Sequence, residues 1–167
     1  MKYIRLLLIS FFVLFVFITI ISLFIPSHIK LSKALNVGAD KSEIMLQISE
    51  PLNWKAWYPG LDSAEILYKD GKAIGWTFNR KGKADIEIIK KTPDEIQAAF
   101  KGENMRPVIN GWKVVTYSQT DSVTVQWYMD FHLRWYPWEK FASLLLEKSY
   151  GPQMEQGLTN LKVLAGD

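Results

Sequence analysis

The chain has 167 residues, with 20 Lys and Arg against 17 Asp and Glu, a net charge of +3 at pH 7 and no cysteine. Lys2 and Arg5 carry two of the three net charges, so the rest of the chain is nearly neutral and lacks the basic surface that nucleic-acid binding needs. The absence of cysteine excludes disulfide bonds and thiolate metal sites.

The N-terminal segment is predicted to span a membrane. Residues 6–25 (LLLISFFVLFVFITIISLFI) carry no charge, and a helix of about 20 residues crosses the ~30 Å hydrocarbon core. The alternative is a cleaved signal peptide, whose apolar region typically has about 7 to 15 residues followed by small residues at the cleavage site. This run is longer and ends in Leu-Phe-Ile-Pro. We therefore predict an uncleaved single-pass anchor over residues 1–27 and a folded domain over residues 28–167.

The charges that flank this span bear on its orientation. Lys2 and Arg5 precede it, whereas Lys30 and Lys33 follow it closely. The positive-inside rule then weakly favours a cytoplasmic N-terminus and an extracytoplasmic domain.

One strand and two short helices are predicted next. Residues 28–36 (HIKLSKALN) form the first strand. Asp40, with Glu43 three positions later, is a capping-box pattern that begins a helix. Pro51 ends that helix and suits the first position of a second one.

The segment PLNWKAWYPG, residues 51–60, is unusually aromatic. Trp54, Trp57 and Tyr58 are spaced i, i+3 and i+4, so they share one face of the second short helix. Pro59 and Gly60 end it. A face made almost entirely of rings is expected to pack against, or line, one end of the domain interior.

Six more strands are predicted, with tight turns about ten residues apart, which is typical of an antiparallel meander. They cover residues 63–68, 73–78, 84–90, 95–100, 111–119 and 122–133. Residues 69–72 (KDGK) form a hairpin signal between the first two. In the last strand apolar and polar residues alternate, so one face is buried and the other meets water.

A long helix is predicted to close the chain, beginning at Pro137. Its apolar stripe consists of Phe141, Leu144, Leu145, Met154, Leu158, Leu161 and Leu164. Gly151 and Pro152 interrupt the pattern, because a proline inside a helix removes one hydrogen bond and bends the axis. We expect a bend near Tyr150.

This order of elements, together with PLNWKAWYPG and the ending YGPQMEQGLTNLK (residues 150–162), resembles the START-like (SRPBCC) superfamily and, within it, the polyketide cyclase/dehydrase and lipid-transport group. The resemblance implies an α+β helix-grip fold. A curved antiparallel sheet of about seven strands wraps around the long C-terminal helix, with two short helices after the first strand. It also implies a cavity between sheet and helix that binds apolar molecules in many relatives.

The sequence offers few groups for catalysis. Its two histidines are His28, next to the membrane span, and His132 on the last strand, too few for a histidine-based metal site. Asp130 and His132 lie two apart on one strand and could act as an acid–base pair. They fall on the polar face, however, so they are weak candidates. We expect no cofactor and no metal.

The apolar face provides better candidates for contact with a ligand, since aromatic residues and methionine offer large, adaptable apolar contact. The hydroxyl oxygens Tyr117 Oη and Thr116 Oγ1 are the polar atoms expected near such a cavity. The predicted ligand-binding residues are Trp54, Trp57, Tyr58, Trp76, Phe78, Trp112, Trp127, Met129, Phe131, Leu145 and Met154.

The sequence therefore favours a membrane-anchored domain that binds or carries a lipid-like or polycyclic molecule without catalysis. One alternative is an enzyme acting on an apolar substrate, as the cyclase name of the family suggests. Another is an interaction module with a filled core, bound to a protein partner that the sequence does not identify.

Overall fold

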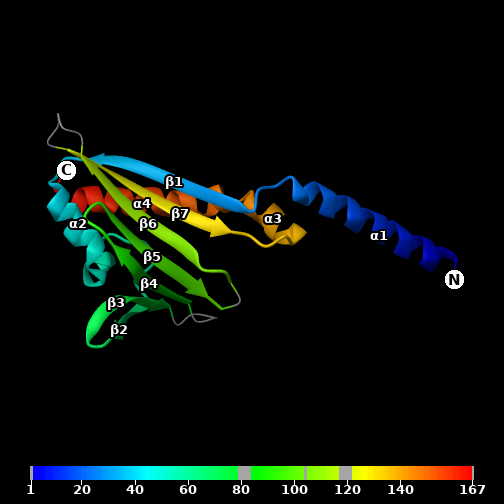
Figure 1. Cartoon of the computed structure of the whole chain (residues 1–167), viewed down its shortest axis with the longest axis horizontal. Coiled ribbons are helices and arrows are strands. Elements are labelled where there is room, and N and C mark those ends of the chain that lie inside the picture. The colour runs from blue at the N-terminus through cyan, green and yellow to red at the C-terminus, as the bar shows by residue number, and fades with distance from the viewer. Residues whose placement is uncertain (1, 79–83, 104, 117–121, 167) are drawn as a thin grey trace.

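The computed structural model describes residues 2–78, 84–103, 105–116 and 122–166. Tyr117 lies outside these described residues. The described part is α+β, as predicted, and Figure 1 shows α1 leaving the folded body as a separate helix. The elements are α1 Lys2–Leu23, β1 His28–Val37, α2 Lys41–Ser49, the 3-10 helix η1 Pro51–Ala56, β2 Ala64–Lys69, β3 Lys72–Phe78, β4 Ala84–Lys91, β5 Glu95–Gly102, β6 Val108–Thr116, β7 Val123–His132, α3 Pro137–Ser143 and α4 Leu146–Leu164.

All seven strands form one antiparallel sheet in the order β1-β7-β6-β5-β4-β3-β2. The first strand therefore pairs with the last, from His28 opposite His132 to Val37 opposite Val123. The register shifts by one residue between β2 and β3 and between β4 and β5, with the extra residue on β3 and β4, and such bulges add bend and twist to a sheet. The meander predicted from turn spacing is confirmed.

The hairpin between β2 and β3 has the turn that its sequence predicts. Asp70 and Gly71 both have positive φ, 50° and 75°. Two such residues in a row make the type I′ geometry, whose twist matches that of the flanking strands.

Figure 1 shows helix α4 lying along one face of the sheet. The contact between Gly157 and Trp127 identifies this as the face that carries the buried residues of β7. Gly157 permits a close approach, because a Cβ there would lie 2.5 Å from Cζ3 of Trp127. Met154, Leu158 and Leu161 are buried at this contact. The apolar stripe predicted for the C-terminal helix thus holds for α4.

The first half of the predicted stripe behaves differently, because the helix is divided at Leu144 and Leu145. Pro152 lies inside α4, which is a single helix, so the bend expected near Tyr150 stays a prediction; the division at Leu144 and Leu145 was not predicted. A proline costs one hydrogen bond, and the packed residues that follow it keep the helix intact. Phe141, Leu144 and Leu145 are exposed.

The aromatic segment PLNWKAWYPG, residues 51–60, closes one end of the domain interior. The rings of Trp54 and Trp112 are 5.3 Å apart, and the ring of Tyr58 is 5.2 Å from that of Trp127. The indole nitrogen of Trp54 donates to the carbonyl of Ile48 at 2.7 Å, so its polar atom is satisfied while its ring is fully buried. The prediction that these rings pack against one end of the interior is confirmed.

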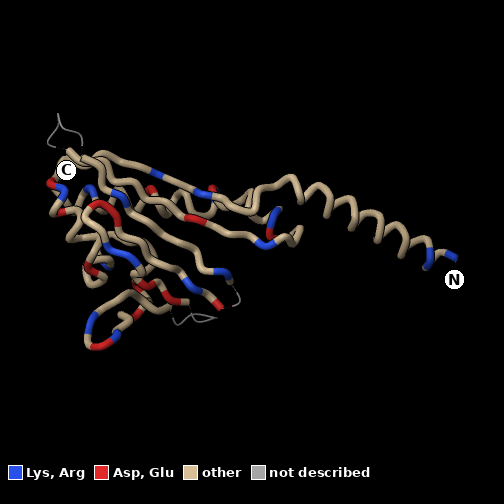
Figure 2. The backbone as a smooth tube through the Cα atoms, viewed as in Figure 1, with Lys and Arg blue, Asp and Glu red and all other residues tan. Residues whose placement is uncertain are grey.

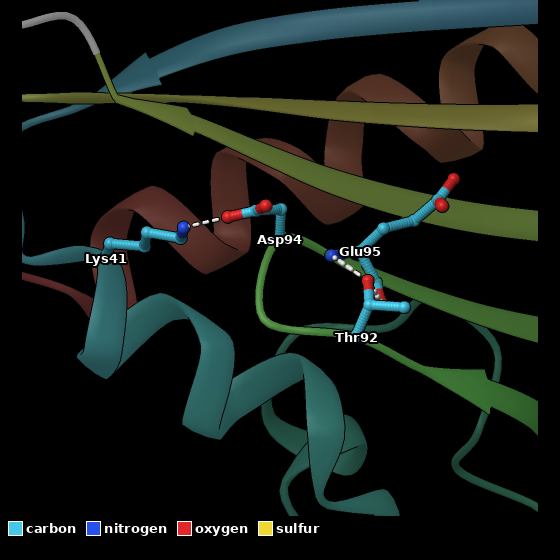
Figure 3. A network of polar contacts seen from close by, with 4 residues as sticks. All are labelled: Lys41, Thr92, Asp94 and Glu95. Atoms are coloured by element: carbon cyan, nitrogen blue, oxygen red, sulfur yellow. Dashed lines mark hydrogen bonds and ion pairs between the residues drawn. The ribbon is translucent and has the colours of Figure 1, made fainter.

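Helix α2 is tied to the turn between β4 and β5 (Figure 3). Lys41 forms an ion pair with Asp94, and the Thr92 hydroxyl accepts from the backbone N–H of Glu95 at 3.0 Å. Asp40 is the N-cap of α2, as predicted, but its side chain makes no capping hydrogen bond. The ion pair instead anchors the first turn.

Candidate functional site

A cavity of about 350 Å³ lies between the inner face of the sheet, α4 and the segment that follows η1. We call it the central cavity. Its size falls within the ~300–1,000 Å³ range of small-molecule pockets. It is lined by Tyr58, Pro59, Gly60, Phe78, Ala84, Phe100, Asn110, Trp127, Met129, Tyr150, Gln153 and Met154.

Asn110 is the most informative polar group in this lining. It points inward from β6 and is 1% exposed. Its Oδ1 accepts from the indole nitrogen of Trp127 at 3.3 Å, whereas its buried Nδ2 has no hydrogen-bond partner among the described residues. An unpaired buried donor costs free energy, so this amide is suited to donate to a carbonyl or hydroxyl oxygen of a bound molecule.

The ionisable groups of the central cavity are phenols. Burial raises the pKa of Tyr58 well above its usual value, and the neighbouring Tyr150 raises this pKa further. Both phenols line the cavity, and its described lining contains no carboxylate, histidine, lysine or arginine. At neutral pH the described lining can therefore donate hydrogen bonds to a bound molecule.

A second cavity, of about 250 Å³, lies beside α3 and is called the α3 cavity. It is lined by Met105, Arg106, Val108, Phe131, His132, Leu133, Arg134, Glu139, Ala142, Ser143, Leu146 and Tyr150. Two arginines, one histidine and one carboxylate stand among otherwise largely apolar walls. Glu139 accepts from the backbone N–H of Arg134 at 2.7 Å, which fixes the loop leading into α3.

The two cavities follow each other along β7. Met129 borders the central cavity and Phe131, the next inward residue, borders the α3 cavity. Tyr150 of α4 borders both, with its ring 5.3 Å from that of Phe131. The side chain of Tyr150 therefore stands where the two volumes meet.

The predicted ligand-binding residues fall into three groups. Tyr58, Phe78, Trp127, Met129 and Met154 line the central cavity, and Phe131 lines the α3 cavity. Exposed Leu145 borders neither. The remaining four are buried in the core beside these volumes and also border neither: Trp54, Trp57, Trp76 and Trp112.

The predicted ligand-binding residues did not include seven residues of the central cavity lining: Pro59, Gly60, Ala84, Phe100, Asn110, Tyr150 and Gln153. The sequence did contain a signal for Asn110. Residues 108, 110, 112 and 114 (Val, Asn, Trp and Val) lie on one face of a strand, so Asn110 is the polar residue on an otherwise apolar face. Our predicted strand began at residue 111, whereas β6 begins at Val108. Thr116, whose hydroxyl was expected to lie near the cavity, is exposed.

The weak catalytic candidates gather with a third residue at the start of β1. His28 Nε2 lies 2.6 Å from Oδ1 of Asp130, and His132 Nδ1 lies 3.5 Å from the same oxygen. The two imidazoles stack with centroids 4.5 Å apart. Both histidines are exposed. One metal-ligand atom from each of the three side chains lies close enough to the others for a single divalent ion to bind all three. The sequence does not reveal this cluster, because His28 and Asp130 are far apart in the chain.

A curved antiparallel sheet that grips a long C-terminal helix, with apolar cavities between them, defines a START-like helix-grip domain. The family described as polyketide cyclase / dehydrase and lipid transport matches residues 28–166, and the chain belongs to this family. A comparison with curated protein sequences finds no relative.

Solved structures share this fold at low sequence identity. A START superfamily protein from Mycobacterium smegmatis is 17% identical with a TM-score of 0.60, covering 82% of this chain and 97% of its own. A norcoclaurine synthase point mutant from Thalictrum flavum, in complex with a transition state analogue, is 16% identical with a TM-score of 0.61, covering 83% and 94%. The di-domain ARO/CYC StfQ from the steffimycin biosynthetic pathway is 9% identical with a TM-score of 0.63, covering 83% of this chain and 51% of its own.

Proposed function

We propose that this protein is a membrane-anchored binding protein or carrier for a hydrophobic small molecule, lipid-like or polycyclic, held in the central cavity. The observation that carries the proposal is the combination of about 350 Å³ of mainly apolar space with one inward, unpaired amide donor at Asn110. Apolar walls supply the affinity, and a single buried donor orients a molecule that carries one oxygen acceptor.

The anchor is the second part of the proposal. Helix α1 has 22 residues and a mean hydropathy of 3.0, enough by length and composition to cross a membrane. Figure 2 shows its charges confined to the N-terminal end. Tethering raises the effective concentration of the cavity near the bilayer, where hydrophobic ligands partition. The positive-inside rule supports an extracytoplasmic position for the domain.

Native mass spectrometry of the full-length protein, released from detergent micelles after incubation with a lipid extract, tests ligand binding. Gln153→Trp places a large ring at an exposed helical position that borders the central cavity, and Gln156→Trp makes the same change on α4 away from the cavity lining. We expect a stoichiometric apolar adduct on the wild type and on Q156W, and its loss on Q153W.

Two results would contradict the proposal. An adduct that persists on Q153W would place the ligand elsewhere. A bare mass for the wild type, after exposure to the extract, would indicate a filled core and favour the interaction module.

An enzymatic function is the second candidate, and the α3 cavity is the observation that favours it. Its lining includes His132 and Glu139, acid–base types that are absent from the described lining of the central cavity. If the protein is an enzyme, the molecule recovered from it should change mass on prolonged incubation with the wild type and not with Glu139→Gln. An unchanged mass with both proteins would support a carrier.

A further inference from the structure

Large apolar side chains are exposed together in one short stretch of the domain, residues 135–145, which we call the interface segment. Trp135 and Trp138 are each 62% exposed, and Leu144 and Leu145 are 66% and 60% exposed. The other five tryptophans are at most 3% exposed. Exposed apolar residues gathered in this way mark a contact surface.

The opposite face of the same segment is buried and holds it against the end of the membrane span. Lys140 is 3% exposed, and its ammonium donates to the carbonyl of Ile25 and to the hydroxyl of Ser27, each at 2.6 Å. Helix α3 also contacts α1, and Figure 1 shows α3 at the end of the body from which α1 leaves. The interface segment is therefore fixed beside the point where the apolar span ends.

This position identifies what covers the exposed rings. On the proposed function α1 spans a bilayer, and its end at Leu23 then lies near the headgroups. Side chains held beside that end by Lys140 must lie at the same depth. Tryptophan and tyrosine are enriched there, because an amphipathic ring suits the boundary between hydrocarbon and water, and the segment offers Trp135, Tyr136 and Trp138.

The charges next to the segment suit the same surface. Arg106 and Arg134 line the α3 cavity together with Glu139, so two positive charges against one negative charge leave a positive balance that attracts anionic headgroups. The guanidinium of Arg134 also lies 5.8 Å from the ring centroid of Tyr136. Glu139, Ala142 and Ser143 of α3 also line the α3 cavity, so one wall of this cavity belongs to the interface segment.

We propose that the interface segment lies in the headgroup region of the bilayer that α1 spans, so that the α3 cavity opens against the lipid surface. The proposal rests on the membrane anchoring in the proposed function. It adds a second, in-plane contact of the domain with the membrane and defines the end of the interior from which a lipid-like molecule would be exchanged.

Tryptophan fluorescence tests the contact in the full-length protein. The protein is reconstituted into vesicles of phosphatidylcholine with about a quarter phosphatidylglycerol, with or without bromine on the phosphatidylcholine acyl chains. Brominated lipid should quench the wild-type emission by about a quarter, because two of the seven tryptophans are exposed at the proposed depth. The double variant Trp135→Gln, Trp138→Gln should show almost no quenching.

The cysteine-free chain allows an independent measurement. Leu144→Cys lies in the interface segment, and Leu52→Cys is a control on η1, also exposed, which follows α2 at the end of the domain opposite α1 (Figure 1). A membrane-impermeant maleimide should label both in detergent, but in vesicles with the domain outward it should label Leu52→Cys at least tenfold faster than Leu144→Cys.

The possible failures are distinguishable. Extraction by alkaline carbonate reports on anchoring, so release of the protein would refute the membrane part of the proposed function. Protein that resists extraction but shows equal emission in both lipids and equal labelling at both positions would refute the interface segment alone. Protection of Leu144→Cys that persists in detergent would show a second copy of the chain on this surface and would also overturn the proposal.

Discussion

Replacing Trp127 by alanine should damage both the stability of the domain and its uptake of ligand. Trp127 is 2% exposed, and its ring lies 6.1 Å from that of Trp57 and 5.5 Å from that of Trp112. Removing a buried tryptophan costs about 3–5 kcal/mol, from the lost transfer free energy and the cavity left behind. This is a large share of the ~5–15 kcal/mol by which a domain is stable.

The same substitution changes the ligand site. Trp127 forms part of the central cavity wall, and its indole nitrogen is the partner of the Asn110 carbonyl oxygen. Without it, the amide loses the contact that holds its free donor toward the cavity. We therefore expect weaker retention of the apolar adduct even where the variant remains folded.

Urea unfolding of the full-length protein in a mild detergent, followed by far-UV circular dichroism, measures the stability change. Trp135→Ala is the matched control, because that side chain is 62% exposed and should alter the free energy of unfolding by no more than about 0.5 kcal/mol. If Trp127→Ala were as mild as this control, with its adduct intact, the assignment of Trp127 to both core and cavity wall would be wrong.

Four further outcomes are expected. Asn110→Leu should weaken retention of oxygen-bearing ligands about tenfold, the equivalent of one hydrogen bond, and should also lower the urea midpoint, because it leaves the buried indole N–H of Trp127 without its acceptor; an unchanged affinity in the folded variant would remove the amide from the site. Gly157→Ala should lower that midpoint, because the new methyl group meets the ring of a buried tryptophan at 2.5 Å; an unchanged midpoint would show that the helix can shift freely. Burial and the carboxylate of Glu95 raise the pKa of Tyr128 to about 12. This phenol therefore contributes stability below about pH 10 that is lost as pH rises toward 12, and melting temperatures of Tyr128→Phe should decline less over that window than those of the wild type. His132→Ala should change the melting temperature and ligand retention little, since its side chain is 56% exposed and borders the α3 cavity but not the central cavity; a loss of activity in a folded variant would favour the enzyme.

The strands could be predicted from sequence because each has a local cause. Alternation along β7 and the Asp70-Gly71 turn depend on neighbouring residues alone. Even there the limits of β6 were missed, because Gly111 looked like the beginning of a strand when it lies inside one. A Cβ at that position would be 2.1 Å from the Tyr128 ring, so the glycine accommodates a cross-strand aromatic that no local pattern reveals.

The cavities could not be predicted in this way, because the sequence pattern of an apolar residue that fills the core is the same as that of one that borders a cavity. Trp112 and Trp127 are neighbours across β6 and β7, yet only Trp127 borders the central cavity. The position of α4 decides between them. The division of the C-terminal helix at Leu144 was likewise hidden, because the apolar stripe continues through it and only the tertiary structure shows that its first part is exposed.

The two ends of the interior are built differently, and this bears on where a ligand is exchanged. At the aromatic end, Trp54, Trp57 and Trp76 each donate an indole hydrogen bond to a backbone carbonyl, so opening that end would break several satisfied, buried contacts at once. At the α3 end the chain turns at exposed Leu144 and Leu145, whose displacement breaks little packing while the hydrogen bonds of Lys140 to Ile25 and Ser27 stay in place. If the interface segment rests on lipid, movement there would exchange contact with water for contact with the bilayer. The lower cost therefore favours exchange through the α3 cavity, past Tyr150, and not through the aromatic end.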